Sequence, residues 1–373
     1  MRITILLLAA TLSLRPAVAN AAPAAPLTGV WQGTLGAEPV RACFNDRQGA
    51  AFGAYFYLSR LVTIPLIKDD KGALLFSEGW PEKAQAPRWA LTQAGPDALG
   101  GIWSQGQRKL PVRLTRVPLN LGEDETPCGS LAFEQPRLNR VRIVRTRAAK
   151  DGLAYTRLTL DQRGHFPSVS VESFALDGDS PAVRRINAIL HQPFVNGADN
   201  WLGCIRSSLD SSAFEGEHNE MVEPRMVTRK WLALNQHWDG FCGGAHPDAS
   251  DSPRLFDRAS GSEIELFDWF TNAAVKREHF GGESDDAITL RPPFKAVIMA
   301  GWKGDKDCRE AMGAEDFWSV ELTRSGFVFT PLLAHVVQAC SEAFALPFAN
   351  AAPFLTVAGK TEAAALKAEI SRR

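Results

Sequence analysis

The sequence predicts an α+β protein in which an N-terminal antiparallel β barrel-like domain is followed by an α+β domain of antiparallel strands packed with a few helices. Residues 27–117 contain short strand-like runs spaced near ten residues apart and separated by glycine, proline and acidic turns, as in an antiparallel meander. Further strand-like runs follow, with a clear helix start near residue 180. The chain has 373 residues, which is too long for one ordinary core, so two domains are expected.

Residues 1–21 have the pattern of a secretory signal peptide. A charged start, Met1-Arg2, precedes an apolar run from Ile3 to Leu14, and small residues follow. The run is too short to cross a bilayer, so we expect no transmembrane anchor. The mature protein is therefore expected to be periplasmic or secreted.

The small all-β domain is expected to span residues 27–133. Gly29-Val30-Trp31 and Gly101-Ile102-Trp103 recur near its two ends. This repetition predicts first and last strands that close beside each other in a small barrel, each glycine making room for a tryptophan. A Gly-x-Trp start also looks like the lipocalin and avidin barrels, but the motif is too short to indicate a ligand, and core packing is the favoured role of the tryptophans.

An acidic, turn-rich stretch at residues 120–137 is the expected boundary, and the α+β domain is expected to span residues 138–358. Ser180 as N-cap and Pro181 at the first helical position predict a helix. Residues 361–373 are rich in Ala, Glu and Lys, so residues 359–373 are expected to form a C-terminal tail with frayed helix. Strands are predicted at residues 140–147, 155–160 and 169–176, in a single long run at 225–239, and in a hairpin that turns at Ser325-Gly326. The arginines of residues 140–147 are expected to form a solvated edge face.

The six cysteines are even in number and lack the Cys-x-x-Cys spacing of zinc or redox sites, so disulfides are expected. The domain boundary predicts Cys43–Cys128. Sequential pairing is the working hypothesis for the other four cysteines, Cys204–Cys242 and Cys308–Cys340, although spacing alone leaves their pairing open.

The charge balance argues against nucleic acid as a partner. The chain carries 41 basic and 42 acidic residues and has no global field that would attract it to nucleic acid or to an anionic membrane. Small neutral or mixed-charge partners fit this balance better.

Residues 242–270 carry the most informative motif. A strand leads into Gly243-Gly244-Ala245-His246, and a segment from Phe256 to Phe270 with Asp257, Gly261 and Asp268 follows. This order resembles the exported domain of unknown function at the lysozyme-sensing end of certain anti-sigma factors, which also accompanies some cell-wall polysaccharide deacetylases. The resemblance covers roughly residues 140–358 and implies an α+β fold with binding rather than catalysis. The sequence shows no anti-sigma segment and no deacetylase domain, so neither activity is carried over.

The candidate binding loop consists of Gly243, Gly244, His246, Asp248 and Asp257. Each residue also has a purely structural interpretation. The paired glycines allow positive φ or close backbone approach, and Asp257 can accept hydrogen bonds from turn amides. His246 is expected to be a buried, hydrogen-bonded histidine that fixes the loop.

The chemical alternative for this region is a metal or general-base site built from His237, Asp239, His246 and Asp248. These are ligand types that zinc accepts, but the spacing matches no metal motif, and no nucleophile or phosphate-loop pattern is present. We therefore expect no metal, no cofactor and no catalytic residue.

The sequence thus favours an exported cell-envelope protein that binds a protein such as lysozyme, or peptidoglycan, without catalysis. Two alternatives remain. One is an envelope hydrolase or deacetylase-like enzyme that uses the His246 loop, and the other is a small-ligand site in the N-terminal barrel.

Overall fold

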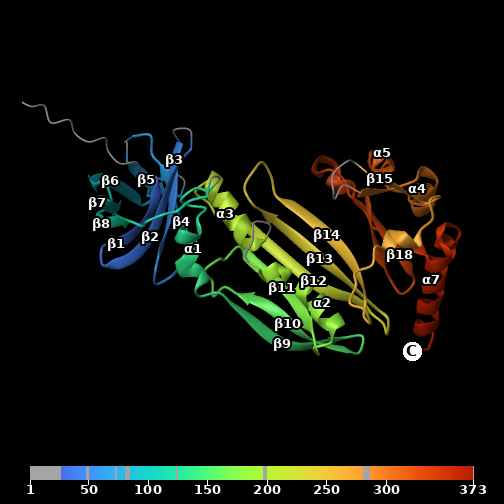
Figure 1. Cartoon of the computed structure of the whole chain (residues 1–373). Coiled ribbons are helices and arrows are strands. Elements are labelled where there is room, and N and C mark those ends of the chain that lie inside the picture. Colours follow the sequence, from blue (N-terminus) through green and yellow to red (C-terminus); the bar gives the residue numbers. More distant parts are fainter. Residues whose placement is uncertain are drawn as a thin grey trace, which may run out of the picture.

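The structure, a computed structural model, describes residues 27–47, 50–71, 74–79, 85–122, 125–195, 200–279 and 286–372. The predicted signal peptide lies outside these residues. Three parts follow one another along the molecule: a barrel, a six-stranded sheet with helices on it, and a C-terminal lobe that ends in a long helix (Figure 1).

The first part is a closed barrel of eight antiparallel strands. The prediction that the two Gly-x-Trp segments lie on the first and last strands is wrong, because Trp103 lies on β7 and β1 closes the barrel by pairing with β8. A Cβ on Gly101 would lie 2.4 Å from the carbonyl oxygen of Ala90, so this glycine makes room for backbone rather than for a tryptophan. The strands are β1 (Gly29–Leu35), β2 (Glu38–Arg47), β3 (Ala50–Tyr57), β4 (Ile64–Lys68), β5 (Leu75–Glu78), β6 (Arg88–Gly95), β7 (Ala98–Gln105) and β8 (Arg108–Arg116).

Side chains fill the barrel interior. Trp31 and Trp89 are fully buried and belong to one apolar cluster with the other inward-facing residues. One carboxylate oxygen, Oε1 of Glu78, accepts hydrogen bonds from Tyr55 Oη at 2.6 Å, Trp89 Nε1 at 3.1 Å and Trp103 Nε1 at 2.7 Å. Burial, followed by the charge of Glu78, raises the pKa of Tyr55. None of the cavities described below lies within this cluster.

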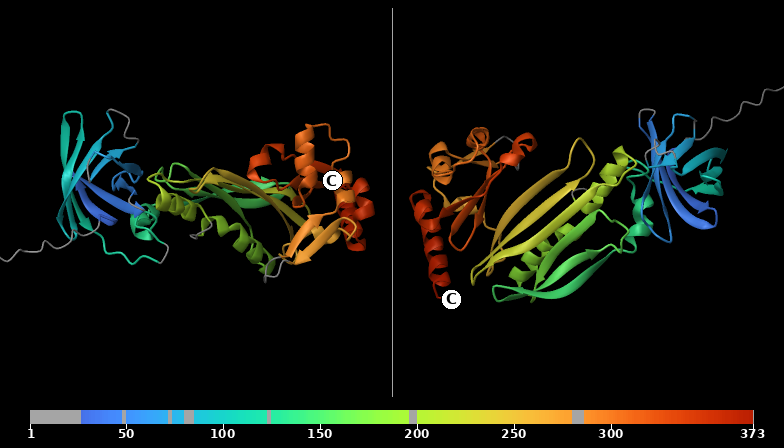
Figure 2. Two further views of the ribbon diagram at one scale, coloured as in Figure 1. Left: turned by 90° about the horizontal axis from the view of Figure 1, so that it is seen from above. Right: turned by 180° about the vertical axis from the view of Figure 1, so that it is seen from behind.

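The middle of the molecule is a sheet of order β14-β13-β12-β11-β10-β9. Its pairing is antiparallel except that β11 and β12 are parallel, because the chain between them crosses over through two helices. Both helices, α2 (Pro181–Leu190) and α3 (Trp201–Ser211), cover the same face of the sheet (Figure 2). The strands are β9 (Arg142–Lys150), β10 (Leu153–Asp161), β11 (Val169–Leu176), β12 (Glu217–Val227), β13 (Trp231–Phe241) and β14 (Asp248–Asp257).

Local signals in this sheet are partly confirmed. Ser180 caps α2 by accepting a hydrogen bond from the backbone N–H of Val183, and Pro181 is the first helical residue, as predicted. The single long strand predicted at 225–239 is wrong, because the chain turns at Thr228, whose Oγ1 accepts from the N–H of Trp231 at 2.9 Å. Two antiparallel strands therefore lie where one was expected.

The C-terminal lobe has an apolar core that includes Trp269, Phe294 and Phe329 and continues into Trp231 and Leu255 of the sheet. The helix predicted near the C-terminus is confirmed as α7, residues 357–370, but it is packed rather than frayed, because Ala363 and Leu366 are buried in this core. A Cβ on Gly359 would lie 2.4 Å from the carbonyl oxygen of Trp269, so the helix depends on a glycine here. The elements are β15 (Val275–His279), β16 (Asp286–Leu290), α4 (Pro292–Ile298), α5 (Lys306–Ala314), β17 (Trp318–Leu322), β18 (Gly326–Pro331), β19 (Phe344–Pro347), α6 (Phe348–Ala351) and α7 (Val357–Ile370), with short 3-10 helices at Gln192–Phe194 (η1), Leu266–Trp269 (η2), His335–Cys340 (η3) and Ala352–Phe354 (η4).

The barrel docks on the sheet through helix α1 (Leu131–Leu138) and α3. Phe56 on the outside of the barrel packs on Phe133 of α1, with ring centroids 5.0 Å apart. Beside them the fully buried guanidinium of Arg137 binds the carboxylates of Glu134 and Glu215. Apolar packing and a buried charge cluster thus join the two parts.

Three disulfides link Cys43 to Cys128, Cys204 to Cys242 and Cys308 to Cys340, the sequential order predicted. They are typical of a protein that folds outside the reducing cytosol. None of the helices in the described residues combines the length and the apolar character that a membrane span requires.

Candidate functional site

The structure places the five residues of the candidate binding loop in three different surroundings. Gly243 and Gly244 have φ values of 87° and 106°, as a sharp turn after a strand requires. Both line a cavity of about 800 Å³ at the junction of barrel and sheet, opposite Ser211 of α3. A Cβ on Gly243 would lie 2.9 Å from Ser211 Oγ, so close approach is one reason for glycine here.

His246 is not the buried histidine that the sequence predicted. Its side chain is exposed and stacks on His335, with ring centroids 3.9 Å apart and an interplanar angle of 6°. Its Nδ1 lies 2.9 Å from the carbonyl oxygen of Pro247. The imidazole lies on the surface because the loop leaves the sheet toward the C-terminal lobe instead of folding under it.

Asp248 and Asp257 are the first and last residues of β14, so about 30 Å of extended chain separates them. Asp257 Oδ1 accepts from the backbone N–H groups of Ala259 and Ser260 at 2.9 and 2.8 Å. Desolvation opposes ionisation, but the hydrogen bonds from Ser260 and Ala259 outweigh it and lower the pKa of Asp257. Asp257 therefore stabilises a turn, and only Asp248 lies near His246.

The group His237, Asp239, His246 and Asp248 is not assembled as one site. His237 Nε2 lies 3.3 Å from Asp239 and its Nδ1 lies 3.1 Å from Asp251, whereas His246 contacts His335. Within the described residues, no group of three or more His, Cys, Asp and Glu side chains is arranged to hold a metal ion.

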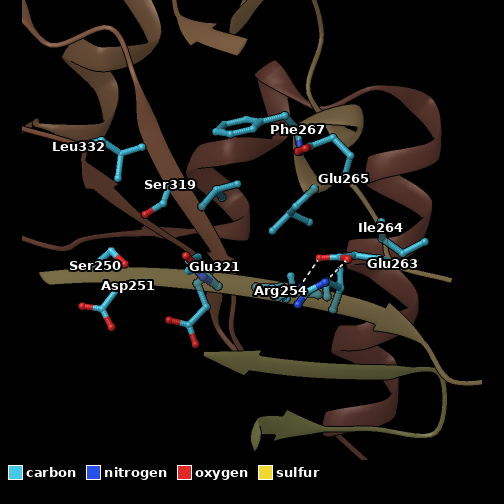
Figure 3. A pocket seen from close by; sticks show the side chains of 16 residues that line it. Ser250, Asp251, Arg254, Glu263, Ile264, Glu265, Phe267, Ser319, Glu321 and Leu332 are labelled. Atoms are coloured by element: carbon cyan, nitrogen blue, oxygen red, sulfur yellow. Dashed lines mark hydrogen bonds and ion pairs between the residues drawn. The ribbon is translucent and has the colours of Figure 1, made fainter. Parts of the chain in front are cut away.

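A groove that the sequence did not predict lies at the free edge of β14. It consists of two adjoining hollows of about 580 and 590 Å³, and we call it the acidic groove. Strand β17 packs against β14 there. Figure 3 shows the side chains of Asp251, from β14, and Glu321, from β17, side by side. The residues shared by both hollows are Ser250, Asp251, Pro253, Ser319, Glu321 and Leu332.

The edge of β14 keeps unused hydrogen-bonding groups in this groove. Near the end of the strand, the carbonyl of Leu255 and the N–H of Asp257 bond outward to residues 264 and 262. Backbone groups alternate along a strand, so those of Asp251 and Ala249 face the same way. The carbonyl of Ala249 accepts from Gln338 and its N–H donates to Asp248 Oδ1, which leaves the backbone groups of Asp251. Among the described residues no backbone hydrogen bond links residues 249–253 to the C-terminal lobe.

Negative charge exceeds positive charge in the acidic groove. Arg254 is already held by Glu263 through bonds of 2.7 and 2.5 Å, and Arg225 by Glu223 at 2.6 Å. Burial raises the pKa of Glu321, and Arg225 only partly offsets this effect, while the charge of Asp251 adds to it. The carboxylates that line the groove are Asp248, Asp251, Glu263, Glu265 and Glu321, against the two guanidiniums of Arg225 and Arg254.

Sequence reasoning missed the acidic groove because its walls come from distant segments. Asp251 and Glu321 are 70 positions apart, and neither stands in a motif. The stretch Asp248-Ala249-Ser250-Asp251 resembles a turn-rich loop in sequence, but it forms the first part of β14. An uncommon concentration of acidic and hydroxyl residues in a strand is the one signal that the sequence offers.

Comparison with known proteins gives a limited result. No family model matches the chain, and no curated protein does. Two solved structures are similar in part. One is a DUF3298 family protein from Pseudomonas aeruginosa PAO1, at 14% identity and a TM-score of 0.36, with 59% of this chain and 95% of that chain covered. The other is a DUF3298 family member from Bacteroides fragilis NCTC 9343, at 10% identity and a TM-score of 0.39, with coverages of 61% and 97%.

Both neighbours are thus members of a family of domains of unknown function, which agrees with the coarse form of the predicted resemblance. At these TM-scores the likeness supports no statement about activity. The link with lysozyme-sensing anti-sigma factors stays a prediction.

Proposed function

We propose that this protein is an exported, noncatalytic binding protein of the cell envelope whose acidic groove receives basic side chains of a partner protein. The observation that carries the proposal is the groove itself, where an open strand edge and an excess of carboxylates lie together. Such a surface attracts a cationic partner, speeds encounter and selects against anionic ones. Lysozyme is the first candidate, because it combines a basic surface with the partner class that the sequence resemblance implies.

Binding fits the geometry better than catalysis does. His237 is hydrogen-bonded to Asp251 and lies 3.3 Å from the carboxylate of Asp239, but no described hydroxyl or thiol contacts it as a nucleophile would. His246 stacks on another imidazole and also lacks such a contact. The exposed carboxylate of Asp251, the half-buried carboxylate of Glu321 and a strand edge offer hydrogen-bond acceptors, which suit recognition of a partner.

The test is calorimetric titration of the mature protein with lysozyme, for the wild type and for the double variant Asp251→Asn, Glu321→Gln. We expect saturable binding that weakens at least tenfold in the variant and that falls with rising salt, because the removed charges face the partner. The matched control is Asp177→Asn with Glu172→Gln on β11 and its following turn, which removes the same charge away from the groove.

Equal binding by the groove variant and the control variant would contradict the proposal, and so would saturable binding to purified peptidoglycan without binding to lysozyme. The enzyme alternative is tested on the same samples. If activity toward a cell-wall substrate were present and lost in a folded His246→Ala variant, the noncatalytic function would be wrong.

A further inference from the structure

Another cavity lies at the opposite edge of the sheet from the acidic groove. It measures about 560 Å³, which is within the range of pockets that hold small organic ligands. It lies between the end of α1, the edge strand β9 and the start of α3. Its apolar wall consists of Leu138, Val141, Ile143, Leu160, Phe194 and Trp201.

Two cations complete the wall. Arg142 and Arg145 line the cavity, both are exposed, and neither forms an ion pair with any of the described residues. On the same strand Arg147 differs, since it is held by Asp177 at 2.6 Å. The unpaired positive charge of β9 is therefore concentrated beside the apolar cavity, where it would attract an anionic group.

A buried donor in the same wall has no partner. Trp201 is 1% exposed, and its indole Nε1–H makes no hydrogen bond. Buried indole N–H groups usually find an acceptor, because leaving one unsatisfied is unfavourable. The ring is held on another side by Phe166, whose centroid lies 5.1 Å away, so the indole cannot turn outward without breaking this packing.

We propose that this cavity is a binding site for an amphipathic carboxylate, a free acyl chain that ends in an anionic group. The apolar wall, which includes the ring of Trp201, accepts the chain, and Arg142 and Arg145 bind the carboxylate. An apolar hollow alone suits many ligands, but the two unpaired guanidiniums select an anion. The site is separate from the acidic groove and does not depend on its function.

The experiment is titration of the full mature chain with dodecanoate below its micellar concentration, with decanoate and with dodecanol. We expect saturable 1:1 binding of dodecanoate. Affinity should fall up to about fourfold for each methylene removed, so that decanoate binds more weakly. Dodecanol, which lacks the charge, should bind at least tenfold more weakly than dodecanoate. The indole N–H signal of Trp201, assigned by its loss in Trp201→Phe, should shift on binding.

The double variant Arg142→Gln, Arg145→Gln should lose at least tenfold in dodecanoate affinity, whereas Arg147→Gln, Lys150→Gln on the same strand should bind as the wild type does. Both pairs are exposed, so folding should be unaffected. Equal affinities of the two double variants would overturn the proposal. It would also be overturned if the protein bound vesicles containing phosphatidylglycerol but not dodecanoate, since a membrane surface would then be the ligand.

Discussion

The barrel and the acidic groove use strand edges and carboxylates in opposite ways. Every strand of the barrel is paired on both sides, and its carboxylate Glu78 accepts three hydrogen bonds on one oxygen. At the groove, β14 is paired on one side only along residues 249–253, and burial, together with the charge of Asp251, raises the pKa of Glu321. The hydrogen-bonding capacity of the barrel is used internally, whereas that of the groove is open to a partner.

This difference indicates which region stabilises the fold and which is available to bind a partner. Polar groups that are fully satisfied inside a fold stabilise it and specify its packing. Polar groups that remain unsatisfied at a surface contribute little to folding and are available for recognition. At the junction between barrel and sheet, the buried guanidinium of Arg137 binds the carboxylates of buried Glu134 and half-buried Glu215, so these charges are used inside the fold, although Arg137 Nε has no partner.

The largest expected effect comes from breaking the junction. Arg137→Met removes the only guanidinium that Glu134 contacts in the described structure and leaves buried negative charge uncompensated. We expect a loss of about 3–5 kcal/mol in the free energy of unfolding, measured by urea denaturation. Arg147→Met is the control, since its ion pair with Asp177 is exposed and worth at most about 1 kcal/mol. Similar losses in both variants would mean that burial of the cluster is not what stabilises the junction.

The second largest effect is expected when a carboxylate of the barrel is removed, and a carboxylate of the acidic groove provides the comparison. Glu78→Leu leaves the Tyr55 hydroxyl and two indole N–H groups without their acceptor, and we expect it to lower the free energy of unfolding by about 2–3 kcal/mol. Asp251→Asn in the open groove should change it by less than about 0.5 kcal/mol. Denaturation curves of the two variants measure the contrast, and equal losses would show that the groove carboxylates are structural.

The smallest effect is a pH dependence of stability that originates at the junction. Burial raises the pKa of Glu134 to about 7, against the opposing effect of Arg137. The folded chain therefore binds this proton more tightly than the unfolded chain does. The resulting stabilisation is complete below the unfolded pKa, about 4.3, and is lost as pH rises through about 7.

Between pH 6 and pH 8 this linkage should lower the free energy of unfolding by about 1 kcal/mol. Urea titrations across this range would measure it, and Glu134→Gln should abolish the slope because glutamine does not titrate. A slope of the same size in Glu134→Gln would assign the dependence to another group.

The sequence by itself determined the local features of this protein. Alternating apolar residues with regular turns predicted the barrel, Ser180 and Pro181 predicted the start of α2, and the domain boundary predicted Cys43–Cys128, whereas spacing left the pairing of the other four cysteines open. These features depend on neighbouring residues, or on a domain boundary that composition reveals, so the order of residues carries them.

Only the tertiary structure decided the sites. It exposed His246, assigned Asp257 to a turn and brought Asp251 beside Glu321. It also placed the unpaired Arg142 and Arg145 beside the indole of Trp201, which lies on a helix more than fifty positions further along the chain. Burial, free strand edges and uncompensated charge are properties of a packed surface, and residues far apart in sequence create them only when the chain has folded.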